Sequence, residues 1–215
     1  DKDKKKIDLL NKGIVPIFEP GLEEILKKNF KQKRLIFTPD LNKAVKNSDI
    51  IFICVGTPSK KNTNSANLKH VFSVVNDLKN IIKKYKIIIT KSTVPVSTGD
   101  EIEKILINLK KKKLVDIVSN PEFLREGEAI RDFVYPDRII IGTDSKKANK
   151  ILKSLYLPII KKTNRYFNTS RRGAELIKYA SNAFLATKIS FINELANLCE
   201  QANVCLLYTS PSPRD

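Results

Sequence analysis

KIIITKSTVPVSTG, residues 86–99, joins an apolar run to a loop of small hydroxyl residues and prolines, and then to a helix start. Three consecutive isoleucines suit a strand that is buried on both faces, as in a parallel sheet. Thr98, followed by Glu101, has the spacing of a capping box and predicts a helix beginning there. A strand that passes through a short loop into a helix is the repeating unit of an α/β fold.

The same plan recurs on both sides of this stretch. We expect buried strands at 35–38, 49–55, 86–90, 114–119 and 138–142, and helices at about 39–48, 67–84, 98–112 and 145–155. Alternating strands and helices imply parallel strands joined by right-handed crossovers. The sequence therefore predicts an α/β fold with a doubly wound parallel sheet.

Composition excludes several classes of protein. The 215 residues are 41% hydrophobic, which supports a folded core and argues against disorder. No apolar run is long enough to cross a bilayer, and the first residues have no signal-peptide core, so we expect a cytoplasmic protein without a membrane partner. Three dispersed cysteines and a single histidine, His70, predict no metal site.

A formal net charge of +17 is the strongest compositional signal, and it leaves a second class of function open. Taken alone, the charge favours a basic nucleic-acid-binding α/β protein. However, the excess is mostly lysine spread along the chain, without the interleaved aromatic residues on which bases stack. We therefore expect no nucleic-acid partner, and anionic nucleotides remain compatible with the charge.

Ligands of doubly wound sheets bind beyond the carboxyl ends of the strands. This rule selects VGTPSK after Val55, KSTVPVSTG after Thr90 and NPEFLREG after Ser119. Each loop alone is compatible with ordinary turn chemistry, and Glu122 and Glu126 alone with solvated side chains. The three loops on one sheet favour a binding site.

A stretch of roughly 30 residues after Ser170 contains no proline and predicts one helix of about 45 Å. Its apolar residues form two stripes, which indicates a helix buried between two lobes. Lys178 and Asn182 lie four residues apart and share a face. They are either a solvated pair or part of a site.

Several of these stretches resemble the UDP-glucose/GDP-mannose dehydrogenase family, from Asp1 to about Val204. They are LLNKGIVPIFEPGLEE, IFICVGTP, KSTVPVSTG, SNPEFLREGEAIRDFVYPDRIIIG and AELIKYASNAFLATKISFINELANLCE. The resemblance implies a Rossmann-like sheet followed by a long interdomain helix. It also implies two successive NAD-dependent oxidations at sugar C6, which turn UDP-glucose into UDP-glucuronate. GDP-mannose and UDP-N-acetylhexosamines are the alternative substrates.

The resemblance also implies residue roles. Asp1 matches the acidic residue that binds the adenosine ribose of NAD, and Lys6 a basic partner near it. The remaining cofactor-binding positions are Val55, Thr57, Ser92, Thr93 and Glu126.

The implied catalytic residues are Thr93, Glu122, Lys178 and Asn182. Glu122 matches a glutamate that orients or deprotonates the water that hydrolyses a thioester intermediate. Lys178 and Asn182 would stabilise negative charge on the C6 oxygen. The implied substrate-binding residues are Glu122, Phe123, Leu124, Lys178 and Asn182.

Two departures from the family qualify these roles. The family's first strand with its GxGxxG turn and its cysteine-bearing GGSCFPKD segment have no counterpart here. We therefore expect a partial chain that does not catalyse the reaction alone, whereas the complete enzyme is expected to be a homodimer. The expected domains are 1–168 for NAD binding and 169–204 for the helix that begins the middle, dimerisation domain. A non-native, disordered tail is expected at 205–215.

Overall fold

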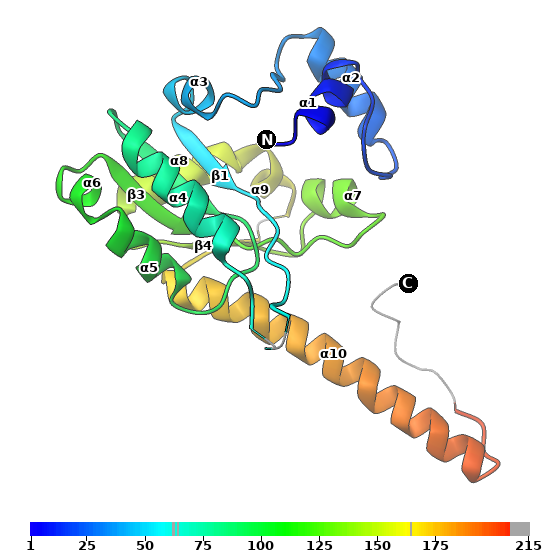
Figure 1. The fold of residues 1–215 in the computed structure, drawn as a ribbon. Helices are drawn as coiled ribbons and strands as arrows, with labels where there is room; N and C mark the ends of the chain where they lie inside the picture. The colour runs from blue at the N-terminus through cyan, green and yellow to red at the C-terminus, as the bar shows by residue number, and fades with distance from the viewer. Residues whose placement is uncertain (62, 64, 164, 207–215) are drawn as a thin grey trace.

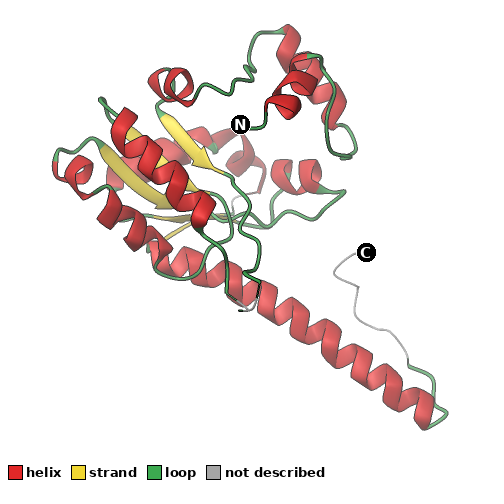
Figure 2. Cartoon of the chain, in the orientation of Figure 1, coloured by secondary structure: helices red, strands yellow, loops and turns green. Residues whose placement is uncertain are grey.

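The computed structural model describes residues 1–61, 63, 65–163 and 165–206, and within them five strands form one sheet (Figure 1). The strands are arranged in chain order as β1 (Ile50–Ile53), β2 (Lys86–Thr90), β3 (Val115–Ser119), β4 (Ile139–Gly142) and β5 (Tyr166–Thr169). Helices flank the sheet (Figure 2), so the expected α/β class is confirmed.

The strand directions are mostly parallel. β1, β2 and β3 pair in parallel, as do β4 and β5. β4 meets β3 antiparallel through the single pair Ser119–Gly142, so the expectation of a wholly parallel sheet is wrong there. The successive pairing of Thr90, Ser119, Gly142 and Thr169 brings four strand ends to one edge.

Two apolar layers hold helices against the two faces of the sheet. On one face, Val75 of helix α4 (Lys69–Ile81) and Ile102 of helix α5 (Thr98–Ile105) pack with Ile88 of β2. On the other face, Leu152 of helix α8 (Lys146–Leu155) packs with Ile87. Adjacent residues of β2 thus pack into opposite apolar layers. This explains why the isoleucines of KIIIT are consecutive and do not alternate with polar residues. Helices on both faces confirm the doubly wound arrangement.

The helices follow most of the predicted boundaries. They are α1 (Lys4–Asn11), α2 (Leu22–Lys31), α3 (Leu41–Lys46), α4 (Lys69–Ile81), α5 (Thr98–Ile105), α6 (Ile107–Lys111), α7 (Ala129–Val134), α8 (Lys146–Leu155), α9 (Leu157–Thr163) and α10 (Arg171–Gln201). The expected helix at 98–112 is two helices, because Leu106 ends α5 and begins α6. None of the described helices combines the length and the apolar composition needed for a bilayer crossing.

Residues 35–38 do not form the expected strand. Ile36 is 80% exposed, and Phe37 stacks on Phe30 of α2 instead of entering the sheet. A strand needs a neighbour that accepts and donates its main-chain hydrogen bonds, and no described segment pairs with these residues. The sheet contains β5 instead, which was not predicted.

α10 is the long helix that the sequence predicts, with 31 residues. Its buried residues all lie in the first turns, and the rest extends from the sheet as a rod (Figure 1). Phe184 and Phe191 are 66% and 65% exposed, so the expected burial of the apolar stripes is not found within this chain. Of the expected tail at 205–215, residues 207–215 lie outside the described residues.

Candidate functional site

The loops that follow β1 and β2 are hydrogen-bonded to each other at the carboxyl edge of the sheet. The Thr57 hydroxyl donates to the Thr93 carbonyl over 2.8 Å. The Ser92 hydroxyl donates to the Val55 carbonyl over 2.7 Å. Four expected cofactor-binding positions are therefore neighbours, although two of their hydroxyl groups are used in holding the loops together.

Glu122 and Lys178 meet although 56 residues separate them. Pro121 and Glu122 follow directly after Ser119 and Asn120 at the end of β3, and α10 carries Lys178. Lys178 Nζ lies 3.3 Å from Glu122 Oε1, and the side chains are 9% and 32% exposed. Glu122 Oε2 also accepts a hydrogen bond from the Leu124 main chain over 2.7 Å, which folds the loop around the carboxylate.

The ring of Phe123 contacts two cations. The Arg138 guanidinium is 4.5 Å from the ring centroid, and Lys178 Nζ is 5.2 Å from it. Arg138 also donates to the Ser181 hydroxyl over 2.9 Å, which links the start of β4 to α10. Arg138 was not predicted as a site residue, although it belongs to the PDRIIIG stretch that carries the family resemblance.

Lys91 is a second cation near Glu122 that the sequence did not single out. The pKa of the Lys91 ammonium is lowered from its ordinary value, chiefly by burial. Cys54 and Glu122 oppose this shift by raising the pKa, whereas the positive charge of Lys178 lowers it further. Lys91 Nζ donates to Asn120 Oδ1 over 3.4 Å. A cavity of about 30 Å³ joins these groups, with a lining that includes Lys91, Asn120, Glu122, Phe123 and Arg138.

Glu175 forms a buried polar centre next to these groups, and it too was missed. Its carboxylate accepts hydrogen bonds from the main-chain N–H groups of Ser97 (2.8 Å) and Gly99 (2.9 Å), and from the Ser119 hydroxyl (2.9 Å). Burial raises the pKa of the Glu175 carboxyl, and the three hydrogen bonds oppose that rise. The expected capping box is absent, because the Thr98 hydroxyl donates to the Pro95 carbonyl and Glu175 caps α5 instead.

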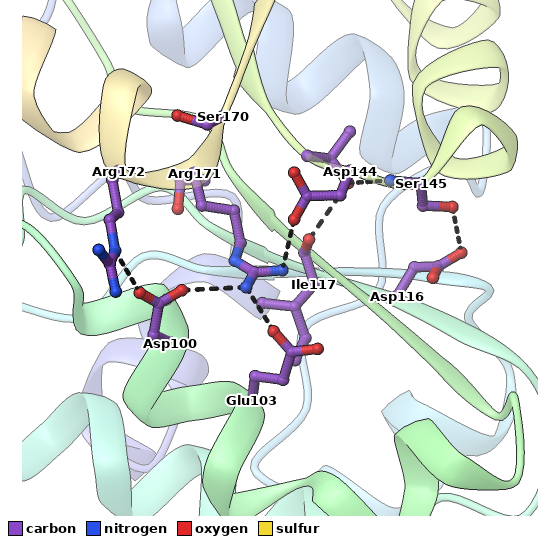
Figure 3. Close-up of polar contacts among 12 residues, drawn as sticks. Asp100, Glu103, Asp116, Ile117, Asp144, Ser145, Ser170, Arg171 and Arg172 are labelled. Atoms are coloured by element: carbon purple, nitrogen blue, oxygen red, sulfur yellow. Dashed lines mark hydrogen bonds and ion pairs between the residues drawn. The ribbon is translucent and has the colours of Figure 1, made fainter.

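An ion cluster fastens the first turn of α10 beside this centre (Figure 3). Arg171 lies 3.0 Å from Asp100 and 3.4 Å from Asp144, and it also contacts Glu103. Arg172 Nε lies 2.6 Å from Asp100. A groove of about 820 Å³ runs along these residues, away from Glu122. The cluster therefore holds α10 to α5 rather than adding to the Glu122 site.

The remaining predicted site residues, Asp1, Lys6, Glu126 and Asn182, are not part of the Glu122–Lys178 pair. Asp1 and Lys6 form their own ion pair at 3.7 Å, at the start of α1. Glu126 is exposed in the turn that precedes α7, and Asn182 is exposed one turn beyond Lys178. The two glutamates of NPEFLREG thus have different environments, and only Glu122 is paired with Lys178.

Comparison with known proteins shows the family to which this chain is similar. Residues 1–160 match the model of the UDP-glucose/GDP-mannose dehydrogenase family, NAD binding domain, and residues 172–206 match that of the family's central domain. UDP-glucose 6-dehydrogenase of Rhizobium meliloti is 49% identical over 208 residues, which are 95% of this chain and 48% of that protein. UDP-glucose 6-dehydrogenase YwqF of Bacillus subtilis is 47% identical over 94% of this chain and 45% of its own length.

Solved structures give the same family. GDP-mannose dehydrogenase of Pseudomonas aeruginosa superposes with a TM-score of 0.88 at 34% identity, over 95% of this chain and 48% of that one. UDP-glucose dehydrogenase of Pyrobaculum islandicum has a TM-score of 0.88 at 36% identity, over 94% and 47%. The chain spans about half the length of the curated relatives that it matches. It belongs to the UDP-glucose/GDP-mannose dehydrogenase family.

Proposed function

We propose that this chain supplies the NAD-binding domain, residues 1–168, and the first helix of the next domain, residues 169–204, of a dehydrogenase that oxidises UDP-glucose to UDP-glucuronate. The observation that carries the proposal is the Glu122–Lys178 pair at the strand ends, beside the joined loops after β1 and β2. The names of the relatives support UDP-glucose over GDP-mannose and UDP-N-acetylhexosamines as the substrate.

The residues of the sheet edge fit NAD. A Cβ added to Gly56 would meet no heavy atom within 4 Å, so a ligand can approach the main chain of that loop. Parallel strands β1 and β2 direct their carboxyl ends to the same place, where doubly wound sheets bind dinucleotides. The Asp1 carboxylate is 47% exposed and can accept hydrogen bonds from ribose hydroxyls, with Lys6 beside it. When bound, NAD supplies the hydride acceptor for the oxidation at C6.

The chain's own groups would bind and polarise the sugar. Lys178 would donate to the C6 oxygen as negative charge develops there, with Asn182 as a neutral donor one turn away. Glu122 would accept a proton from the water that hydrolyses the thioester, and Thr93 would anchor that water. Phe123 and Leu124 would form the apolar wall against the sugar.

We also propose a cytoplasmic location and a homodimer for the complete enzyme. The three cysteines are all free, which suits a reducing compartment. The exposed apolar residues Phe184, Phe191 and Leu198 along α10 suit a second subunit.

A chimera tests the proposed activity. In it, this chain replaces the matched segment of the Rhizobium meliloti enzyme, to which it is 49% identical. We expect NADH formation with UDP-glucose, in a ratio of about two NADH per sugar because an alcohol becomes a carboxylate by two hydride transfers. GDP-mannose and UDP-N-acetylmannosamine serve as competing substrates. A chimera that folds and binds NAD but prefers either of these sugars would contradict the proposed substrate.

A further inference from the structure

Lys178 owes its position to the way the first turns of α10 are held. Beyond these turns, and after a hydrogen bond from Arg138 to Ser181, the helix extends away from the sheet (Figure 1). Lys178 is nevertheless buried, with its ammonium 3.3 Å from Glu122. Contacts near the base of α10 must therefore fix both the rotation of the helix and its distance from the sheet.

Glu175 makes the contacts that meet this requirement. It lies three residues before Lys178, so the two side chains lie on the same side of the helix. It is 2% exposed, and its hydrogen bonds to Ser97, Gly99 and Ser119 are all 2.8–2.9 Å long. A buried carboxylate with three donors has a single well-defined position, because any movement leaves a buried charge unsatisfied.

The three donors belong to the segments that carry the other proposed site residues. Ser119 lies three residues before Glu122. Ser97 and Gly99 follow the loop that contains Ser92 and Thr93, at the amino end of α5, where a carboxylate also suits the helix dipole. One side chain of α10 thus bonds to the two other segments that must converge on the substrate.

The surrounding backbone is shaped around this carboxylate. A Cβ added to Gly99 would lie 2.9 Å from Glu175 Oε1 and 3.3 Å from the Ser119 hydroxyl. No side chain can stand between α5 and Glu175. The ion cluster of Arg171 holds the same end of α10 (Figure 3), but its partners lie on α5 (Asp100 and Glu103) and just after β4 (Asp144).

We propose that Glu175 is a positioning residue: it joins the loop after β2, the end of β3 and α10, and thereby places Lys178 against Glu122. This inference rests on the proposed function, which gives Lys178 and Glu122 their roles. Among the described residues, Glu175 makes no hydrogen bond to the charged groups of Lys178 or Glu122, so it acts on them through the segments that it joins.

Amine labelling of the purified chain, without substrate or cofactor, tests the proposal. Acetylation of Lys178 is followed by peptide mass spectrometry and compared with Lys188, an exposed lysine on the same helix. In Glu175→Gln, one carboxylate oxygen becomes an amide that faces an N–H or O–H donor. We expect Lys178 to react about tenfold faster while Lys188 is unchanged, because the base of α10 opens locally.

Glu194→Gln is the matched control, since it makes the same change at an exposed position of α10. It should leave Lys178 labelling unchanged. Amide hydrogen exchange distinguishes local positioning from general destabilisation: exchange should accelerate in residues 95–101 and stay slow in β2. Labelling of Lys178 in Glu175→Gln within about twofold of the parent would overturn the proposal.

Ser119→Ala covers the case in which Glu175→Gln does not fold. It removes one of the three donors and should accelerate Lys178 labelling about threefold, and an unchanged rate would overturn the proposal. The outcome is independent of the proposed activity. An inactive chimera leaves the labelling result intact, and a failed labelling result leaves the substrate assay intact.

Discussion

Gly142→Ala should weaken the attachment of α10 to the sheet. Gly142 ends β4 and pairs with both Ser119 and Thr169. A Cβ at this position would lie 2.7 Å from the Ser170 carbonyl oxygen and from Ala174 Cβ, and 2.8 Å from Arg171 Cα. These atoms are main chain or Cβ, so they cannot rotate away. The base of α10 would have to retreat by roughly 0.8 Å to reach the ~3.5 Å at which carbon atoms attract each other.

The expected magnitude follows from this geometry. Overpacking of a rigid site costs about 1–3 kcal/mol, and three rigid contacts place Gly142→Ala near the upper end, at about 3 kcal/mol. With a urea dependence of about 2 kcal/mol per M, the unfolding midpoint should fall by about 1.5 M. Lys178 is buried near the base of α10, so a displaced base should expose it. The Lys178 amine should therefore react faster with an acetylating reagent in Gly142→Ala than in the parent.

Gly56→Ala is the control for glycine replacement itself. A Cβ at Gly56 meets nothing within 4 Å, so this variant reports only the smaller backbone entropy of the unfolded chain, and we expect a gain of about 0.4–1 kcal/mol. Urea unfolding followed by far-ultraviolet circular dichroism compares both variants with the parent. If Gly142→Ala has the same urea unfolding midpoint as Gly56→Ala, α10 does not lie as close to β4 as these distances require.

The remaining predictions concern charge. In the chimera, Glu122→Gln should slow hydrolysis of the thioester more than its formation, so that a covalent sugar adduct accumulates in intact mass spectra; normal turnover would make Glu122 an ordinary loop residue. Lys178→Ala should lower turnover about 10²-fold with nearly unchanged NAD affinity, and equal losses in both would indicate a structural lysine. Arg171→Ala should cost about 1.5–3 kcal/mol of unfolding free energy because it removes charge-assisted hydrogen bonds, although Asp100 keeps Arg172 and Glu103 keeps Lys110; Arg172→Ala, with a side chain 68% exposed, should cost about 1 kcal/mol or less. Hydrogen bonds from Arg172 and then Arg171 hold the pKa of the Asp100 carboxyl below its ordinary value, so this contribution to stability is complete above about pH 4 and is lost as pH falls through the lowered pKa. Asp100→Asn should therefore flatten the acid side of the curve of urea midpoint against pH, and a curve that keeps the parent's slope would show that this carboxyl is not responsible.

Local pattern was enough to find most of the sheet. β2 and β4 are buried on both faces, and a strand in that position must be apolar throughout, so KIIIT and RIIIG could be located from composition alone. α10 was equally clear, because its long stretch without proline can form one continuous helix. By contrast β5, with the sequence YFNT, is only partly buried and carries no such signal.

The family resemblance selected Glu122 and Lys178 as candidate site residues, and the three-dimensional structure decided what surrounds them. Residues 35–38 have the composition of a strand, yet no described segment pairs with them, and strand pairing is a property of the neighbour as much as of the sequence. The antiparallel contact of β4 with β3 likewise depends on the path of the connecting chain.

The sequence by itself determined most of the sheet and the long helix, and it selected Glu122 and Lys178, which the fold brings together. Only the tertiary structure decided how α5 is capped: Thr98 and Glu101 have the local spacing of a capping box, but Glu175, 76 residues beyond Gly99, takes that place. The physical reason is that apolar periodicity acts between neighbours in the chain, whereas a buried carboxylate is satisfied by whichever donors the fold brings within 3 Å. Such partners have no fixed spacing in sequence.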